Sequence, residues 1–167
     1  EAVTWFLQGA VNGSITSQTM LGHAWFYGWG VAVDLDRSAF WMQRAADAGD
    51  PKAQRDMGAY YWNGFGVPED NVEALKWFLL AIEHYAPSED ESRRLATVDR
   101  DQLSENLSRS ETAEARKRAQ TWRAIPFVKT DKDLVSEAAV ALRRDDYAKA
   151  ARIYGPLAER GFAEAQT

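Results

Sequence analysis

The sequence LGHAWFYGWGVAVDLDRSAFWMQRAA, beginning at Leu21, is matched by MGAYYWNGFGVPEDNVEALKWFLLAI, beginning at Met57. Identical residues recur at a constant spacing of 36 positions, namely Gly22 with Gly58, Gly28 with Gly64, Gly30 with Gly66, Val31 with Val67, Asp34 with Asp70, Trp41 with Trp77 and Ala45 with Ala81. Self-similarity at a fixed period of tens of residues is the signature of a repeat architecture. The chain is therefore expected to consist of stacked copies of one unit.

Each copy predicts a pair of helices separated by a glycine turn. The first helix is expected to end at Gly28, because glycine adopts a left-handed conformation at little cost, and the second to begin after an N-capping Asp34. Asp70 is the matching cap in the second copy, with Glu73 as its capping-box partner. Gly22 lies inside a helix, where glycine costs about 1 kcal/mol relative to alanine, so its repetition predicts a close approach of two helices.

The remaining segments are also predicted to be helical. Residues 1–11 match the second helix of a unit, so the segment 1–86 holds a half repeat and two full copies. The segment 87–124 predicts two charged amphipathic helices that close the array. The segment 130–167 returns to the repeat pattern and is expected to open a second, truncated array. The prediction is an all-α fold of about nine helices.

Two groups of apolar side chains are predicted to be buried. One repeated position is expected to lie in the core in every copy, and it holds Trp5, Trp41 and Trp77. In the charged segment, one helical face is expected to pack on the last repeat, and it holds Leu95, Val98, Leu103 and Leu107.

The composition limits the class of function. The net charge of −5 argues against a nucleic-acid-binding protein, which normally carries a basic face. The absence of cysteine excludes disulfide bonds and thiolate sites. No apolar run approaches the roughly 20 residues needed to span a bilayer. With 46% hydrophobic residues, the chain has enough apolar surface for a folded core.

The repeat pattern, A-x-x-x-(L/M)-G-x-x-(W/Y)-x-x-G-x-G-V-x-x-D-x-x-x-(S/A)-x-x-W-x-x-x-A, resembles that of the Sel-one-like repeat family, a branch of the tetratricopeptide-like solenoids. The match is strong over residues 2–85 and partial over residues 145–167. Ser17 and Ser38 replace the usual small alanine, and Tyr85 replaces the glycine that closes a unit. The resemblance implies a right-handed α–α superhelix, a solenoid of antiparallel helix pairs, with the first helices lining its concave side.

The resemblance also implies a function. Members are usually non-enzymatic adaptors that assemble other proteins, and bacterial members often act in envelope, signalling or secretion-related complexes. By tetratricopeptide-like geometry the concave face is expected to bind a protein or peptide through Thr19, His23, Phe26, Tyr27, Arg55, Ala59, Trp62 and Asn63. Trp29 and Phe65, between the turn glycines, are candidate edge contacts. Trp, Tyr and Arg dominate binding hot spots. The alternative is that Phe26 and Trp62 pack between neighbouring units.

Other chemistries find little support in the sequence. The G-W-G and G-F-G turns lack the third glycine and the Lys-Ser/Thr of a phosphate loop. His23 and His84 lie far apart without a carboxylate at ligand spacing, and no serine-hydrolase motif is present. We therefore expect no cofactor, no metal and no catalytic residue. A carbohydrate or cell-wall binding module, or an immunity-type inhibitor of a toxic effector, is the alternative function.

The first residues and the family resemblance give expectations about the longer protein and its location. Glu1 is not methionine and no signal-peptide pattern follows it, so we expect a fragment or the mature part of a longer protein. The resemblance implies a periplasmic or secreted location. Because the ends of a solenoid are apolar, head-to-tail self-association is a further expectation.

Overall fold

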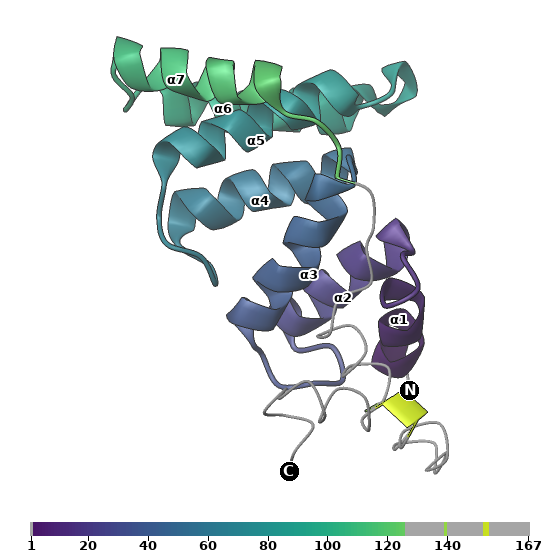
Figure 1. Ribbon diagram of the computed structural model, residues 1–167. Helices are drawn as coiled ribbons and strands as arrows, with labels where there is room; N and C mark the ends of the chain where they lie inside the picture. The colour runs from purple at the N-terminus through teal and green to yellow at the C-terminus, as the bar shows by residue number, and fades with distance from the viewer. Residues whose placement is uncertain (1, 126–138, 140–151, 154–167) are drawn as a thin grey trace.

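The computed structural model describes residues 2–125, 139, 152 and 153. Within these residues the chain is all-helical (Figure 1). The elements are α1 (Ala2–Ala10), α2 (Ile15–Tyr27), α3 (Leu35–Asp47), α4 (Pro51–Asn63), α5 (Asn71–His84), the short 3-10 helix η1 (Pro87–Glu89), α6 (Asp90–Ser104) and α7 (Arg109–Thr121).

This architecture confirms the predicted all-α solenoid of helix pairs. The described residues hold seven α-helices instead of about nine. The two further helices, which were expected in the segment 130–167, lie outside the described residues.

Caps and turns define each pair of helices. The side chains of Asp34 and Asp70 each accept a hydrogen bond, at 2.9 Å, from the backbone N–H three residues later, which confirms both N-caps. Gly28 and Gly64 end the first helices with φ of 74° and 69°, in the left-handed region. The capping-box role predicted for Glu73 is wrong, because its carboxylate accepts hydrogen bonds from the side chains of Lys76 and Arg118, described below.

The two mid-helix glycines lie where two helices meet. A Cβ atom on Gly22 would lie 2.9 Å from the Cε atom of Met42. A Cβ atom on Gly58 would lie 2.5 Å from the ring of Phe78. The predicted close approach is confirmed in both copies, α2 against α3 and α4 against α5.

Successive units are joined by the same polar contact. Buried Gln18 of α2 donates through Nε2 to the carbonyl of Ala10, at 3.2 Å. Buried Gln54 of α4 donates in the same way to the carbonyl of Ala46, also at 3.2 Å. Each glutamine is a second donor to a carbonyl in the last turn of the preceding second helix, which also accepts from the N–H of Gly13 or Gly49.

The second glycine turn packs on the unit before it. A Cβ atom on Gly66 would lie 2.0 Å from the carbonyl oxygen of Leu35, at the start of α3. The corresponding Gly30 has no described atom within 4 Å of its Cβ position. The two turns therefore share a sequence pattern but differ in their surroundings.

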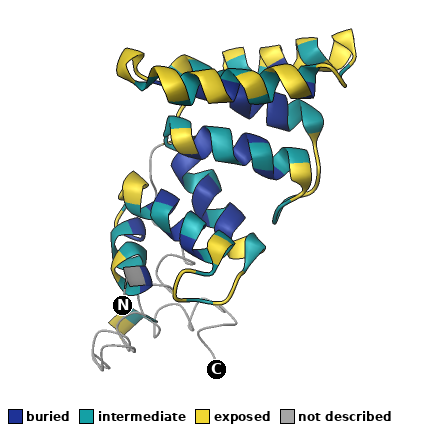
Figure 2. Cartoon of the chain, turned by 180° about the vertical axis from the view of Figure 1, so that it is seen from behind, coloured by how far each residue is buried: buried dark blue, intermediate teal, exposed yellow. Residues whose placement is uncertain are grey.

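Two polar helices cover the last repeat. Both α6 and α7 pack on α5, and their outer faces are exposed (Figures 1 and 2). The buried residues of α6 are Ala96 and Leu103, and the half-buried Leu107 follows the helix. The predictions for Leu95 and Val98 are wrong, since these side chains are 39% and 46% exposed. Leu95 lies about 100° around the helix from the buried Ala96, and Val98 about 160° from it.

The repeated tryptophan position is not buried in every copy. Trp41 and Trp77 are 4% and 1% exposed, as predicted, whereas Trp5 is 66% exposed. Trp41 lies on α3, which packs against both α2 and α4. Trp5 lies on α1, whose main helix contact is with α2 alone. One neighbouring helix does not enclose a side chain as large as tryptophan.

Candidate partner-binding surface

The candidate site lies on the first-helix surface, meaning the exposed and half-buried side chains of α2, α4 and α6 together with the turn residue Trp29. Eight residues of α2 and α4 were predicted to contact a partner here. Four of them make contacts within the solenoid, and the other four face solvent to different extents.

Two of the four residues that make contacts within the solenoid lie on α2. Thr19 is buried, 8% exposed, and its hydroxyl donates to the carboxylate of Asp50 at 3.0 Å. Phe26 is half-buried and stacks on Tyr60 of α4, with 5.3 Å between ring centroids. Both side chains therefore join the first repeat to the second.

The corresponding pair on α4 contacts the covering helices and α5. Arg55 donates from Nε to the carboxylate of Asp99 on α6, at 2.6 Å. Burial opposes the charge on Arg55, but its hydrogen bond and ion pair with Asp99 raise its pKa above the ordinary value. Trp62 is half-buried and meets the edge of Phe78 at 6.2 Å. The contact of Phe26 with Tyr60 matches the alternative that this side chain packs between units, whereas Trp62 contacts the second helix of its own unit.

An exposed aromatic group remains at one end of the first-helix surface. Tyr27 and Trp29 are 59% and 50% exposed, and their rings are stacked with 5.2 Å between centroids and 21° between planes. His23 lies beside them, 6.1 Å from Tyr27 and 6.3 Å from Trp29 between ring centroids. We call these three residues the aromatic platform.

The platform is connected to α4 by one polar contact. His23 Nε2 lies 2.8 Å from a carboxylate oxygen of Asp56. The side chains of His23 and Asp56 are 28% and 32% exposed, so solvent reaches both. Sequence reasoning missed Asp56, because the matching residue of the first copy is Met20 and no repeated signal marks the position.

The remaining predicted residues lie beside the platform. Ala59 is half-buried, and Asn63 is exposed with its amide donating to the Ala59 carbonyl at 2.8 Å. Phe65 is half-buried and packs edge-on against Phe26, 5.5 Å between ring centroids. Trp29 and Phe65 thus occupy equivalent turn positions, but only Trp29 is largely exposed.

Elsewhere on the first-helix surface, cations and acids pair between helices. Lys52 lies 3.7 Å from Glu89, and Arg55 pairs with Asp99 at 2.6 Å. Asp56 differs from these two acids because its described ion-pair partner is a histidine. The site therefore combines exposed aromatic rings with a carboxylate that forms no ion pair with a lysine or arginine among the described residues.

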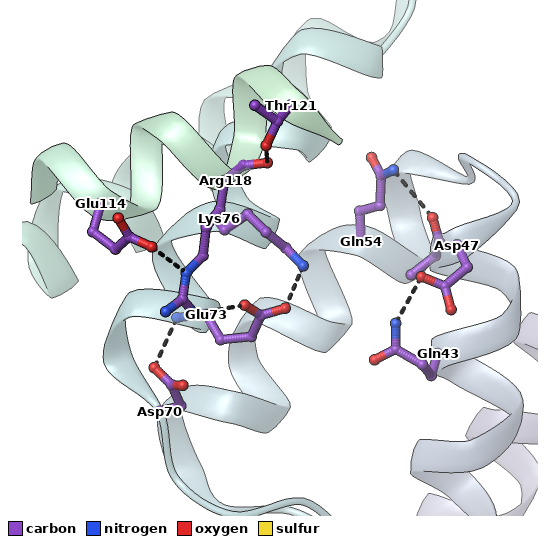
Figure 3. A network of polar contacts seen from close by, with 10 residues as sticks. Gln43, Asp47, Gln54, Asp70, Glu73, Lys76, Glu114, Arg118 and Thr121 are labelled. Carbon is purple, nitrogen blue, oxygen red and sulfur yellow. Dashed lines mark hydrogen bonds and ion pairs between the residues drawn. The ribbon is translucent and has the colours of Figure 1, made fainter. Parts of the chain in front are cut away.

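A second polar network lies under α7, on the second helices (Figure 3). Glu73 accepts hydrogen bonds from Lys76 and from Arg118 of α7, the latter at 3.2 Å. Lys76 is buried and its Nζ lies 3.8 Å from the centroid of the Trp77 ring. Arg118 also donates to Glu114 at 3.0 Å. These contacts join α7 to α5, so we interpret the network as structural.

The described residues hold neither a metal-binding group nor a membrane-spanning helix. In residues 2–125, 139, 152 and 153, no three His, Asp or Glu side chains are grouped so that they could hold a metal ion. In the same part of the chain, no helix is both long enough and apolar enough to cross a membrane.

The helix pairs, their glycine turns and their capping aspartates define a helical-repeat protein. Comparison with known families assigns the repeats, because the profile of the Sel1 repeat matches residues 15–50 and 51–84. The chain therefore carries two Sel1 repeats, which confirms the predicted resemblance. Repeats of this kind are generally non-catalytic protein-interaction scaffolds.

One solved structure agrees with this assignment, and two further proteins are similar to the chain to a smaller extent. The c5321 protective antigen of uropathogenic Escherichia coli strains, which displays the same repeat fold, superposes with a TM-score of 0.64 at 29% identity, covering 77% of this chain and 29% of that chain. A Sel1 repeat protein from Oxalobacter formigenes has a TM-score of 0.45 at 24% identity, covering 91% and 61%. The chitin synthase regulator SKT5 of Malassezia restricta is 39% identical over 56 residues, which is 33% of this chain and 4% of that protein.

Proposed function

We propose that this chain is an adaptor that binds a segment of another protein on its first-helix surface, centred on the aromatic platform. The observation that carries the proposal is the exposed stack of Tyr27 and Trp29. Large exposed aromatic side chains are enriched at binding hot spots. The neighbouring Thr19, Phe26 and Arg55 are occupied by contacts within the fold, and this supports placing the contact at the platform.

The proposed mechanism is preorganisation. Tyr27 is stacked on Trp29, and His23 is held by Asp56 of the next unit, so the rings are positioned before a partner arrives. A partner that binds to a rigid surface loses less conformational entropy on binding than one that must order flexible loops.

The test is affinity capture with matched variants. The chain and its Tyr27→Ala/Trp29→Ala variant are immobilised, and retained proteins are identified by mass spectrometry. Ile125→Ala is the control, because this side chain is also exposed and apolar but follows α7 and lies outside the first-helix surface. We expect a protein that the parent and the control retain and the platform variant loses. Retention of the same proteins by all three would contradict the proposal.

A second candidate function uses the same observation. Sugar rings stack on exposed aromatic side chains, so the Tyr27–Trp29 pair also supports carbohydrate binding. A glycan microarray distinguishes the two functions, because a carbohydrate-binding module acts without a protein partner. Binding to a glycan that is lost in Tyr27→Ala/Trp29→Ala would favour the second function, and an array without hits would exclude it.

A further inference from the structure

We propose that the partner segment is basic, and that it places an arginine side chain on the aromatic platform with its guanidinium directed toward Asp56. This inference rests on the proposed function, since it names the chemistry of the segment that the same surface binds. It is carried by charge complementarity between one half-buried, solvent-accessible carboxylate, two exposed rings and a planar cation.

The aromatic half of the site suits a guanidinium. Tyr27 and Trp29 are stacked with 21° between their planes, and about half of each residue is open to solvent. A guanidinium is planar and stacks on aromatic faces, and tryptophan is the best of the aromatic partners. An aliphatic side chain would use the apolar area of these rings but not their negative faces.

The chain already makes this contact internally. The guanidinium of Arg37 lies over the ring of Trp25, 4.7 Å from its centroid, and that of Arg44 lies 5.6 Å from the centroid of Phe40. Lys76 makes the equivalent contact with Trp77. In this fold, cations supplied by the chain therefore lie on several of the rings, whereas the cation for Tyr27 and Trp29 would come from a partner.

The acidic half of the site lies on the next helix. Asp56 contacts His23, which itself touches both platform rings, so the carboxylate lies one side chain away from the stack. The other acids that pair across the first-helix surface, Glu89 and Asp99, are matched by Lys52 and Arg55. Asp56 is therefore the carboxylate of this surface that an incoming arginine would neutralise by a charge-assisted hydrogen bond.

The net charge of the chain acts in the same direction. At −5 it favours encounter with basic segments, and an acidic segment would be repelled. The general charge does not by itself place an arginine at the platform, so the experiment separates the local site from this background.

The experiment is selection from a random peptide library displayed on phage, with the purified chain as bait. Selected peptides are synthesised with arginine and with citrulline, its neutral isostere, and titrated by calorimetry against four proteins. These are the parent, Tyr27→Ala/Trp29→Ala, Asp56→Asn and Asp36→Asn. Asp36 is an exposed acid in the first turn of α3 and controls for net charge. Circular dichroism verifies that each variant is folded.

We expect the selected peptides to be enriched in arginine. Replacement by citrulline, the platform double substitution and Asp56→Asn should each weaken binding about tenfold or more, since a hydrogen bond to a charged group and a cation–π contact each contribute on this scale. Asp36→Asn should leave the affinity within about twofold of the parent, because its carboxylate belongs to the background charge.

Other outcomes overturn the inference in distinguishable ways. Peptides that depend on Tyr27 and Trp29 but lack basic residues would overturn it and leave the proposed function standing. Arginine peptides that Asp36→Asn weakens as much as Asp56→Asn would show a general charge effect and overturn it too. A library without any peptide that depends on the platform would overturn both the inference and the proposed function.

Discussion

Gly30 and Gly66 occupy the same position of the two repeats and have similar backbones, with φ of 75° and 65°. A side chain at either position must adopt a left-handed conformation, which costs roughly 1–2 kcal/mol. Only at Gly66 would the added Cβ also meet a backbone atom, the carbonyl oxygen of Leu35. The pair therefore separates the cost of backbone conformation from the cost of packing between repeats.

Gly30→Ala is expected to lower the free energy of unfolding by about 1 kcal/mol, and Gly66→Ala by about 2 kcal/mol more, as overpacking against a rigid neighbour typically costs. Urea unfolding monitored by circular dichroism measures both. Equal losses in the two variants would mean that the second turn does not lie against α3.

Asp47, at the end of α3, carries a charge in a partly buried position. Burial raises the pKa of its carboxyl, while a hydrogen bond from Gln43 and the charge of Lys76 act in the opposite direction without cancelling the effect. A carboxyl with a raised pKa binds its proton more tightly in the folded state. Its charged form therefore lowers stability above that pKa, and the loss is recovered as the pH falls through it.

Asp47→Asn is expected to raise the free energy of unfolding at about pH 7, because the neutral amide still accepts from Gln43 and carries no buried charge. The advantage over the parent should shrink as the pH falls toward about 4. Urea titrations of both proteins at several pH values measure the difference. If the stability advantage of Asp47→Asn grew as the pH fell, the pKa of Asp47 would be lowered by folding and not raised.

Helix α7 illustrates how an element with few buried residues is held in place. Ala115 is fully buried, and the half-buried Trp122 packs on the core, 6.4 Å from Trp77 between ring centroids. The backbone N–H of Ile125 donates to the Asp47 carbonyl at 2.8 Å, so the chain after α7 also contacts α3. Apolar contacts in the middle of the helix and just after its end accompany the ion pair of Arg118.

Removal of Arg118 and removal of the Glu73 carboxylate should lower the stability by different amounts. Arg118 is 41% exposed, and ion pairs at the surface contribute about 0–1 kcal/mol, so Arg118→Gln is expected to cost less than about 1 kcal/mol. Lys76 is 11% exposed, so Glu73→Gln leaves a nearly buried ammonium without its carboxylate and should cost about 3 kcal/mol. Chemical denaturation measures the free energy of unfolding of both variants and tests whether Glu73→Gln costs more than Arg118→Gln.

A compensating substitution provides the control. The first copy has Phe40 where the second has Lys76, so Lys76→Phe is compatible with the repeat. The cost of Glu73→Gln should largely disappear when Lys76→Phe is already present, because no buried charge is then left unpaired. An unchanged cost would mean that Glu73 acts through Arg118 alone.

The sequence predicted helix α6 but not its orientation. The apolar positions Leu95 and Val98 suggested one face, whereas the buried face contains Ala96 and Leu103. Alanine carries little signal in an apolar pattern, yet a small residue is what permits close packing on α5. By contrast, the caps at Asp34 and Asp70 follow from local geometry and were predictable from two residues each.

At the scale of the whole molecule, the two repeats depend on the helices that cover them. Leu75 and Phe78 of α5 are buried in a cluster that includes Leu103 of α6 and Ala115 of α7. A chain that ends at residue 86 would expose this cluster and is expected to lose its cooperative unfolding transition, whereas a chain that ends at residue 125 should keep it. Thermal unfolding and size-exclusion chromatography of the two fragments test this. A monomeric, cooperatively folding short fragment would show that two repeats suffice.

The candidate site was only partly predictable, because the contacts between successive units cannot be read from the repeat. The 36-residue period places residues on the first helices, and two of the residues predicted there to bind a partner, His23 and Tyr27, are reached by solvent. It does not give the rotation between successive units, which decides that Arg55 contacts Asp99 and Phe26 contacts Tyr60. Contacts between different copies depend on residues that do not repeat, so a periodic pattern cannot reveal them.

The unequal coverage of the helices has a mechanical consequence. Among the described helices, α1 is held mainly by α2, whereas α5 is held by α4, α6 and α7. Under tension applied along the array, α1 would detach at low force while the segment around α5 still resisted. The protein would then behave as a spring with a compliant end and a stiff end, and the aromatic platform lies on the helix next to the compliant one.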